Sequence, residues 1–485
     1  MEHGLNRKKI AGGFFWKIME NGGAQGVQFI VSVLLARMLS PKEYDVLAIM
    51  MIFTGLANIF VQNGFALALV QKKESDETDF SSVFFFNLML SALVYMVIFF
   101  AALPIAAFYD NPDIVNMLRV MAVIVFFGGV ISVQNAYISK NMEFRSLFFA
   151  SFLSSVLSGI VSVYMAMRGY GVWALVWQQI IYYIFLCLIL FLTISWKPMC
   201  LFSLSRLREM FGFGWKILLS AVLDNLFTNL HGLVMGKIYD RGTLGNFTRG
   251  EQFPKIIITN IGAAIQSVLF PLMAQSQDNR AKLRSILRES IMISSYLLFP
   301  MMAGMIAIAD KLILLLLGSK WAGAIPFLRL MCLGYLFWPL HVTNLQALNA
   351  LGRSDIFLKL EIIKKILGTI VLIVGIRYNA LIFVGLKVLA DYICVLINTW
   401  PHRKLLEYSV YRQLGDIFPS LLLAFLMGAC VYGAGRLAGE GWISLLLQII
   451  IGIVLYPALS WLFRNESFSM LRLKIHTLRK NTQEE

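Results

Sequence analysis

The sequence predicts an all-α, polytopic membrane protein with fourteen transmembrane helices, built as two parallel-repeat six-helix lobes followed by two C-terminal helices. Three observations support this fold class. The 485 residues are 59% hydrophobic and only 14% charged, whereas soluble domains carry about 25% charged residues. Apolar runs long enough to cross a bilayer core recur from end to end. Finally, one segment near the start of the chain reappears near its middle.

The repeated segment carries the tripeptide Trp-Lys-Ile, at residues 16–18 and again at residues 215–217, which is an offset of 199. Each copy follows small residues and an aromatic, and each continues into about 20 mostly apolar residues and a polar turn. This spacing is too long for a solenoid and is typical of a membrane protein with two similar bundles. The alternative is that Trp-Lys is an interfacial anchor that recurs by chance.

Apolar periodicity and length give the expected spans. They are 14–38, 46–70, 81–108, 114–138, 147–167, 171–195, 213–237, 253–274, 289–309, 324–350, 356–376, 379–400, 417–436 and 441–463. The first run is long and has no small-residue cleavage site, so we expect a retained helix and not a signal peptide.

The distribution of basic residues orients these spans. With the N-terminus in the cytoplasm, 26 of the 42 Lys and Arg fall on the inner side and 8 on the outer side, when the inner half of span 356–376 and the outer end of span 417–436 are counted with the adjoining segments. This positive-inside bias predicts an even number of helices with both termini cytoplasmic. It also accounts for the net charge of +15 through anionic lipid, so no nucleic-acid partner is expected.

Six spans precede the second Trp-Lys-Ile, so both copies enter the membrane in the same direction and the repeats are parallel. The predicted organisation is an N-lobe (1–195, helices 1–6), a basic cytoplasmic linker (196–212), a C-lobe (213–400, helices 7–12), helices 13–14 (401–465) and a cytoplasmic tail (466–485).

The cysteines are odd in number and widely spaced, without a metal-binding or disulfide pattern. We interpret them as packing residues and expect neither a metal nor a cofactor. They are Cys187, Cys200, Cys332, Cys394 and Cys430.

Several ordered strings point to a family. They are LARMLSPKEY (35–44), TDFSSVFFFN (78–87), GYGVWAL (169–175), VLFP (268–271), LGSKW (317–321) and LNALGRSD (348–355). Over nearly the whole chain they resemble the Wzx-type polysaccharide flippases of the multidrug/oligosaccharidyl-lipid/polysaccharide (MOP) exporter superfamily, which also holds the multidrug (MATE) exporters. The nearest branch exports lipopolysaccharide, exopolysaccharide and teichuronic-type units.

Three positions depart from this family pattern. Asp45 stands where Gly is usual, His231 where Asp is common, and Gln62 where Asp is frequent. The resemblance therefore does not by itself support a proton or cation role at positions 62 and 231.

The resemblance implies a function in the bacterial cytoplasmic (inner) membrane. It implies a monomeric flippase that moves an undecaprenyl-pyrophosphate-linked oligosaccharide to the outer leaflet, by alternating access driven by an ion gradient. Its partners would be the polyprenyl-pyrophosphate-linked glycan, membrane lipids, a polysaccharide polymerase and chain-length proteins. The two extra helices would form a groove for the polyprenyl tail.

A pyrophosphate crossing hydrocarbon needs a wet cavity with cations and hydrogen bonders, because an isolated charge at the bilayer centre costs about 2.5–3.5 kcal/mol even on the lenient insertion scale. Arg and Lys are the natural phosphate ligands. Polar residues at helical spacing follow one face of span 213–237, and a similar stripe follows span 14–38. These stripes would line a central cavity or form a polar seam between the lobes. The substrate-binding candidates are Lys17, Asn21, Gln28, Arg37, Lys216, Arg249 and Arg329.

A second set of candidates could couple transport to an ion. Asp224 lies in mid-span and is the strongest of them, and His231 could titrate near neutral pH. Lys387 and Asp391 are four residues apart on one helix, so a structural ion pair is an equal alternative. Lys17, Lys216, Arg37 and Arg329 could instead be anchors that snorkel to lipid phosphates. The ion-coupling candidates are Glu20, Asp224, His231, Lys387 and Asp391.

Two other functions are less compatible with the sequence. A drug or metabolite antiporter on the same scaffold usually needs only twelve helices, so the last two spans argue against it. A polysaccharide polymerase or glycosyltransferase would need a large outer loop, and the longest here is residues 238–252. The sequence therefore predicts a transporter and not an enzyme.

Overall fold

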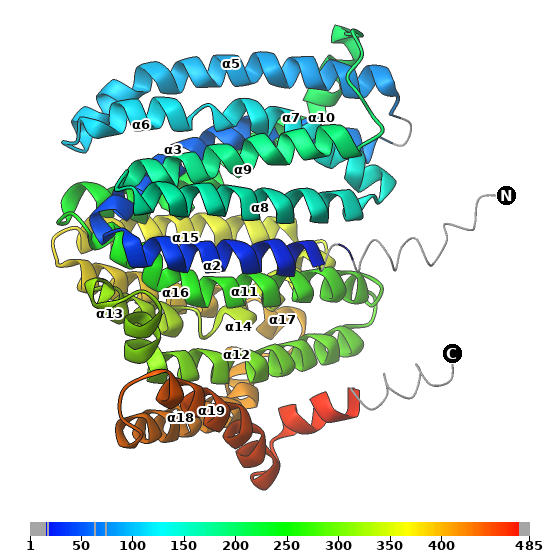
Figure 1. The fold of residues 1–485 in the computed structure, drawn as a ribbon. Coiled ribbons are helices and arrows are strands. Elements are labelled where there is room, and N and C mark those ends of the chain that lie inside the picture. Colours follow the sequence, from blue (N-terminus) through cyan, green and yellow to red (C-terminus); the bar gives the residue numbers. More distant parts are fainter. Residues whose placement is uncertain (1–15, 17–18, 63–64, 73–74, 475–485) are drawn as a thin grey trace. The chain divides into compact units, whose positions relative to one another are not determined.

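A computed structural model describes residues 16, 19–62, 65–72 and 75–474, and these residues are helical with short connections (Figure 1). The chain divides into two compact units, Met1–Gly245 and Asn246–Glu485. Unit 1 contains a π-helix (Glu20–Ala24), α2 (Gln25–Met38), α3 (Pro41–Gln62), α4 (Phe65–Gln71), α5 (Glu77–Phe108), α6 (Asp113–Met121), α7 (Ile124–Asn141), α8 (Phe144–Met167), α9 (Val172–Thr193) and α10 (Leu204–Ile238).

Helix α11 (Thr243–Ala274) starts at the end of unit 1 and continues into unit 2. The other helices of unit 2 are α12 (Arg280–Leu316), α13 (Ala324–Gly334), α14 (Trp338–Ala350), α15 (Ser354–Gly375), α16 (Ala380–Thr399), α17 (His402–Leu405), α18 (Val410–Leu437) and α19 (Trp442–Leu462).

Eleven helices among the described residues are long and apolar enough to cross a membrane, and they occupy eleven of the fourteen predicted positions. The chain is therefore a multi-pass membrane protein. The other three predicted spans correspond to the π-helix with α2, to α11 and to α15. Helix α15 carries more charged residues than a simple apolar span, namely Lys359, Glu361, Lys364 and Lys365. The count of fourteen remains a prediction.

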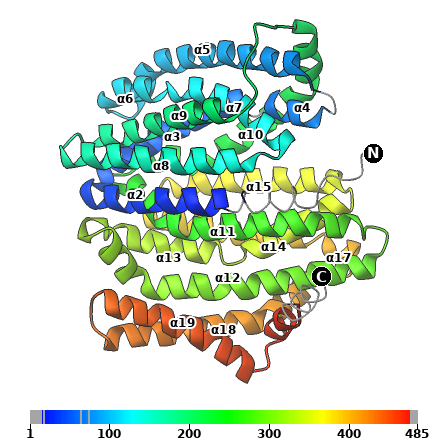
Figure 2. The ribbon, with the colours of Figure 1, turned by 45° about the vertical axis from the view of Figure 1, so that its right-hand side comes forward.

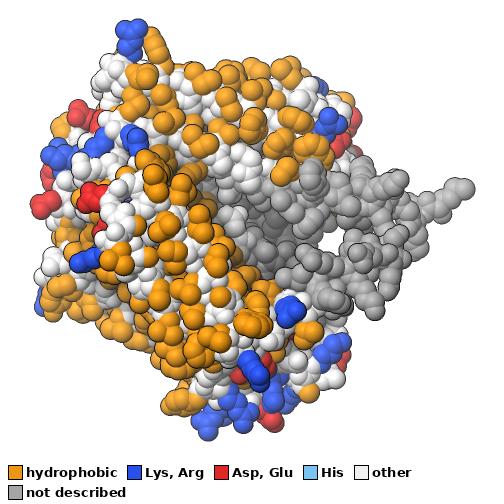
Figure 3. Space-filling model, turned by 60° about the horizontal axis from the view of Figure 1, so that its bottom comes forward, with side chains coloured by type: hydrophobic (Ala, Val, Ile, Leu, Met, Phe, Trp, Pro, Cys, Tyr) orange, Lys and Arg blue, Asp and Glu red, His pale blue; other side chains and the backbone are white. Residues whose placement is uncertain are grey.

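The described surface is largely apolar. Figure 3 shows hydrophobic side chains spread broadly over one face, with charged side chains gathered toward its margins. Leu93 and Phe100 on α5 and Ile453 on α19 are among the exposed large hydrophobics. Such a surface is expected where helices meet lipid tails.

In unit 1, α8 and α9 form a hairpin, and α10 packs on α3. Gly232 and Gly236 stand one turn apart on α10. A Cβ atom at either position would lie 3.3 Å from Ile52 or Ile49 of α3. Small residues with this spacing let two membrane helices approach closely.

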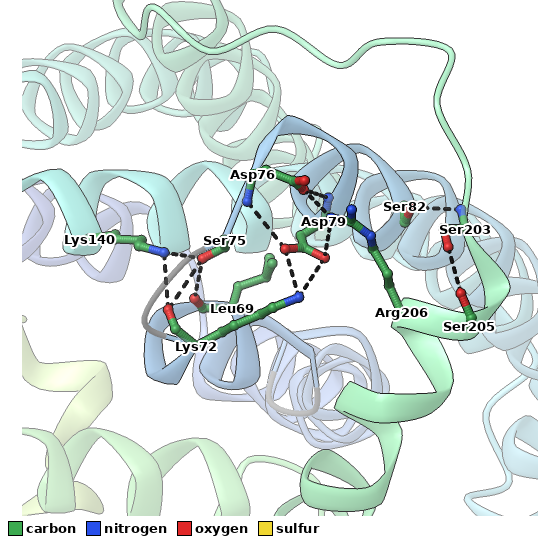
Figure 4. Close-up of polar contacts among 10 residues, drawn as sticks. All are labelled: Leu69, Lys72, Ser75, Asp76, Asp79, Ser82, Lys140, Ser203, Ser205 and Arg206. Carbon is green, nitrogen blue, oxygen red and sulfur yellow. Dashed lines mark hydrogen bonds and ion pairs between the residues drawn. The ribbon is translucent and has the colours of Figure 1, made fainter.

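The buried carboxylate of Asp79 organises one end of unit 1, which the predicted topology places on the cytoplasmic side (Figure 4). The Lys72 ammonium approaches it to 2.9 Å, and the Arg206 guanidinium to 3.2 Å. Asp76 completes a capping box with Asp79 at the start of α5. Arg206 also hydrogen-bonds Asp76 and thereby lowers the pKa of that carboxyl. A fully buried carboxylate requires such cationic and hydrogen-bonding partners.

The same end of α5 holds the chain segment that leads to α10. The backbone N–H of Met199 donates to Ser81 Oγ at 3.1 Å, and that of Ser203 donates to Ser82 Oγ at 2.9 Å. Trp196 packs against Phe80, with ring centroids 5.8 Å apart. The predicted linker is therefore attached to α5, and its last residues are already helical because α10 begins at Leu204.

A second polar contact joins two turns that the predicted topology places on the outer side. The Asp45 carboxylate accepts hydrogen bonds from the backbone N–H groups of Gly242 and Gly245, at the start of α11. Gly242 has a φ of +101°, and a Cβ on Gly245 would lie 2.2 Å from the carbonyl oxygen of Pro41. Asp45 thus acts as an N-cap supplied by another helix. By the offset of 199, these turns are the equivalent turns of the two predicted repeats.

Neighbouring contacts reinforce this junction. The Tyr109 hydroxyl donates to the carbonyl of Leu233 at 3.2 Å, and the Lys237 ammonium lies 2.7 Å from Asp110. The hydrogen bond from Lys237 lowers the pKa of Asp110. Its stabilising effect is therefore present above the ordinary pKa of an aspartate, and is lost as the pH falls through the lowered value.

In unit 2, α12, α18 and α19 lie together in both ribbon views (Figures 1 and 2). At one end, Arg288 of α12 pairs with Asp416 at 2.9 Å and with Glu466 at 2.8 Å. At the other end, the Lys311 ammonium donates to the carbonyl of Gly435 and to Ser444 Oγ, both at 2.6 Å. Cations of α12 therefore fix the last two spans at both of their ends.

We predict that Asp79→Asn loosens the linker, because Lys72 and Arg206 lose their shared anion. A hydrogen bond to a charged group is worth about 1.5–3 kcal/mol, so the unfolding free energy should fall by about this amount. The measurement is tryptic cleavage after Lys197, Arg206 and Arg208 in folded protein, which should become faster. Glu77→Gln, an exposed acid in the same turn, is the control. Equal cleavage in both variants would contradict the prediction.

We also predict that Gly245→Ala separates the turn from Pro41 and Asp45, because its Cβ has no space. Overpacking of this kind costs about 1–3 kcal/mol, so the unfolding temperature in detergent should fall. Gly415→Ala is the matched control, since a Cβ there meets nothing within 4 Å. The interpretation fails if both variants unfold at the wild-type temperature.

Candidate functional site

Four of the predicted site residues cannot be compared with the structure at the level of side chains. Lys17 lies outside the described residues. Glu20 and Asn21 belong to the π-helix and Lys216 to α10, but their side chains are outside the description as well. Their proposed roles stay predictions.

Gln28 is exposed and lies beside α8 of unit 1. Its amide nitrogen lies 3.4 Å from Ser155 Oγ of α8. Ser151, Ser158 and Ser162 follow the same buried face of that helix. Gln28 of α2 therefore lies next to the row of serine hydroxyl groups on α8.

Other predicted residues on the unit 1 helices differ in exposure. Arg37, in the last turn of α2, is exposed, and Asp224 of α10 is exposed as well. His231, two turns further along α10, is half-buried. Asp224 is thus exposed, and its place in a cavity stays a prediction.

The two predicted arginines of unit 2 have local partners. Arg249 is only 9% exposed, donates to Gln252 Oε1, and places its guanidinium 5.9 Å from the ring centre of Trp321. Arg329 of α13 pairs with Asp310 of α12 at 2.7 Å. Both side chains therefore hold the fold of unit 2 in this conformation.

Lys387 and Asp391 form the ion pair that their spacing predicts. The Lys387 ammonium lies 3.1 Å from the Asp391 carboxylate, one turn along α16. The Lys387 side chain is 20% exposed and that of Asp391 is 41% exposed. The pair therefore lies partly open on a membrane-spanning helix.

The sequence reasoning missed two similar pairs in the same unit. On α11, the Lys255 ammonium lies 3.7 Å from the Glu251 carboxylate, and on α15, Lys364 pairs with Glu361. Tyr335 adds a hydrogen bond of 2.7 Å to Glu251. The i,i+4 and i,i+3 spacings of these residues were the signal that could have identified them.

These pairs are neighbours in space. Lys387 is close enough to Glu251 for an electrostatic interaction, although the two residues belong to different helices. The Cys394 thiol, on α16, interacts electrostatically with Asp391 and with the Glu361–Lys364 pair. We call Glu251, Lys255, Glu361, Lys364, Lys387 and Asp391 the three-pair group.

The interior of unit 1 has a different chemistry. Its buried polar side chains are chiefly amides and hydroxyls, such as Asn58 of α3 and Asn87 and Ser91 of α5. Gly128 and Gly129 of α7 make room for them, since a Cβ there would lie 2.4 Å from Asn58 Oδ1 or 2.6 Å from Ser91 Oγ. Ser91 Oγ donates to the carbonyl oxygen of Val125 at 3.2 Å, whereas Asn58 Oδ1 and the Asn87 side-chain amide have no hydrogen-bond partner among the described residues.

Three relatives are named for the transport or biosynthesis of succinoglycan, teichuronic acid or lipopolysaccharide. The succinoglycan biosynthesis transport protein ExoT of Rhizobium meliloti is 24% identical over 94% of this chain and 93% of its own length. The teichuronic acid biosynthesis protein TuaB of Bacillus subtilis is 23% identical over 87% and 88%. The lipopolysaccharide biosynthesis protein WzxC of Escherichia coli is 23% identical over 84% and 83%. These relatives confirm the resemblance to Wzx-type flippases and the prediction of a transporter.

Solved structures show the same fold. A lipid II flippase MurJ in an inward closed conformation superposes with a TM-score of 0.72, at 16% identity, covering 93% of this chain and 98% of the other. An inward-facing multidrug resistance MATE transporter of the MOP superfamily gives a TM-score of 0.59, at 16% identity, covering 86% and 98%.

The family comparison covers more than half of the sequence. The polysaccharide biosynthesis protein family matches residues 34–326, from the end of α2 to the start of α13. The chain belongs to the polysaccharide biosynthesis protein family.

Proposed function

We propose that this protein is a flippase of the bacterial cytoplasmic membrane. It moves undecaprenyl-pyrophosphate-linked oligosaccharide repeat units from the inner to the outer leaflet, for the synthesis of a surface polysaccharide. Family membership and the named relatives support this function. Both termini lie in the cytoplasm, in agreement with the distribution of basic residues.

The three-pair group is the observation that carries the proposal. Lysines on helices that cross hydrocarbon are costly unless they meet a partner or a wet cavity. Here they lie on α11, α15 and α16. A pyrophosphate is the part of the lipid-linked substrate that requires cations, and the sugar requires hydrogen bonders.

The proposed transport cycle is alternating access between two six-helix lobes, driven by an ion gradient. The junction of Asp45 with the start of α11 would stabilise the state that is closed on the outer side. Release of the sugar to the outer leaflet would require this junction to open. The polar stripes of α2 and α10 would line the path, with Lys17, Lys216 and Arg37 at its ends.

A drug or metabolite antiporter is the alternative, because the MATE transporters share the fold. The two functions differ in whether the substrate carries a polyprenyl tail. The last two spans, α18 and α19, favour the lipid-linked substrate, since the resemblance implies a tail groove there.

The deciding experiment reconstitutes the purified protein in vesicles that contain undecaprenyl-pyrophosphate-linked oligosaccharide on the inner leaflet only. A membrane-impermeant lectin or glycosidase added outside should gain access to the sugar at a rate that depends on the protein. Protein-free vesicles are the control. No gain of access, together with export of small cationic drugs by the same vesicles, would support the antiporter.

Replacement of Asp224 tests the ion-coupling candidate in the same vesicles. Asp224→Asn should remove the stimulation of transport by a proton or sodium gradient, because the neutral amide cannot exchange a cation. Asp278→Asn, an exposed acid in the turn after α11, should leave the stimulation intact. Full stimulation in the Asp224 variant would remove this residue from the coupling mechanism.

A further inference from the structure

A short helix follows the last span. After α19 the chain makes a turn and is helical again over residues 466–474, which we call the C-terminal helix and which is the red helix beyond α19 in Figure 1. Arg464 in the turn has a φ of +49°. The side-chain oxygen of Asn465 accepts a hydrogen bond of 3.1 Å from the backbone N–H of Phe468. The left-handed residue ends α19, and the new N-cap starts a separate helix.

Two tryptophans indicate the depth of α19 in the bilayer. Trp442 and Trp461 stand at its two ends, and both are exposed. Their separation of 19 residues corresponds to about 28 Å along an α-helix. The hydrocarbon core of a bilayer is about 30 Å thick, and tryptophan is enriched at its two interfaces. With the C-terminus in the cytoplasm, as the topology predicts, Trp461 lies at the inner interface and the C-terminal helix begins just beyond it.

Contacts with α12 hold the C-terminal helix at this level. Lys474 pairs with Glu289 at 2.7 Å, and the ring of Phe468 packs against that of Tyr296 with centroids 6.1 Å apart. These contacts add to the ion pair that Arg288 forms with the first residue of the C-terminal helix. Glu289 is the first residue of the predicted ninth span. The contacts therefore keep the C-terminal helix beside the inner interface.

The exposed surface of the turn and of the C-terminal helix combines large apolar side chains with cations. Trp461, Phe463 and Leu473 are 68%, 63% and 69% exposed. Arg464 and Arg472 are exposed as well, and neither forms an ion pair within the described part of the chain. The other two charges of the segment 463–474 are compensated by α12. An apolar surface with two uncompensated positive charges remains.

The inner leaflet fits this surface better than a soluble protein does. The exposed apolar side chains continue the surface of α19, where Ile453 and Val454 are exposed toward lipid. At an interface, aromatic and aliphatic side chains enter the acyl region while arginines reach the headgroup phosphates. A soluble protein would have to displace headgroups to reach Trp461.

We propose that the C-terminal helix lies in the plane of the inner leaflet, and that Arg464 and Arg472 bind the phosphates of anionic phospholipid such as phosphatidylglycerol. This inference is independent of the transported substrate. It has a structural consequence, because the C-terminal helix is fastened to α12 and α12 also fixes α18 and α19. Lipid bound at the two arginines thus anchors the cytoplasmic end of these helices to the bilayer surface.

The test measures the depth of the C-terminal helix with a spin label at Leu473→Cys. The full-length protein, with its native cysteines replaced by alanine, is reconstituted in phosphatidylcholine vesicles that contain increasing fractions of phosphatidylglycerol. Collisions of the label with oxygen, which concentrates in the bilayer, are compared with collisions with a water-soluble nickel chelate. At high phosphatidylglycerol, the oxygen-to-chelate ratio should be several times that of a label at Gln277→Cys. This control lies in the exposed turn after α11, on the same predicted side.

The decisive variants remove the arginines. One basic residue near an anionic surface changes binding about fivefold. In Arg472→Gln, the fraction of phosphatidylglycerol needed for half the effect should therefore rise about fivefold. Arg464→Gln with Arg472→Gln should leave the label accessible to the chelate at every fraction.

The matched control is Arg403→Gln with Lys404→Gln. It removes the same charge from two exposed side chains of α17, on the same predicted side, and should keep the wild-type depth. All of these side chains are exposed, so each variant should also keep the wild-type unfolding temperature in detergent without added phospholipid.

Three results overturn the inference. A label that meets the chelate as readily as the Gln277 control, even in phosphatidylglycerol, would place the C-terminal helix in water and leave its surface to a protein partner. Equal depth in pure phosphatidylcholine would show an apolar contact without phosphate binding. Wild-type depth in the double arginine variant would exclude the two arginines as ligands. None of these outcomes concerns the lipid-linked sugar, so the proposed function would stand in each case.

Discussion

The need to compensate charge away from water is the constraint on which this structure depends. Hydrocarbon offers neither hydrogen bonds nor counterions, so ionised groups and free backbone amides must find partners within the protein. Asp79 finds them in Lys72 and Arg206, and Asp45 finds them in two backbone N–H groups. Lys387 finds one in Asp391. The contacts of Asp79 and Asp45 also join segments that the packing of apolar side chains alone would leave free to slide.

The two units meet this constraint with different chemistry. Unit 1 buries mainly amides and hydroxyls away from its Asp79 cluster, whereas unit 2 concentrates lysine–carboxylate pairs on α11, α15 and α16. Helix α15 loses apolar character through its pair and the neighbouring lysines Lys359 and Lys365. Helices that face lipid on every side have no need of such residues.

Much of the fold could be predicted from the sequence because hydropathy and the distribution of Lys and Arg report directly on the bilayer. Eleven of the predicted spans correspond to apolar helices, and the Lys387–Asp391 pair follows from its spacing. The neighbourhood of Glu251 and Lys387 could not be predicted, because it depends on how α11 packs near α16. In the sequence, Asp45 stands out only as a departure from the family pattern. Its partners lie about 200 residues away in sequence, and no local rule reports such a contact.

The capping of α11 by Asp45 has a consequence for hydration. When α3 moves away from this turn, one carboxylate and the N–H groups of Gly242 and Gly245 lose their partners together. Lipid tails cannot replace these hydrogen bonds, and only water can solvate all three groups at once. The turn can therefore separate only as solvent enters between its halves, so wetting and movement at this end of the protein form a single event.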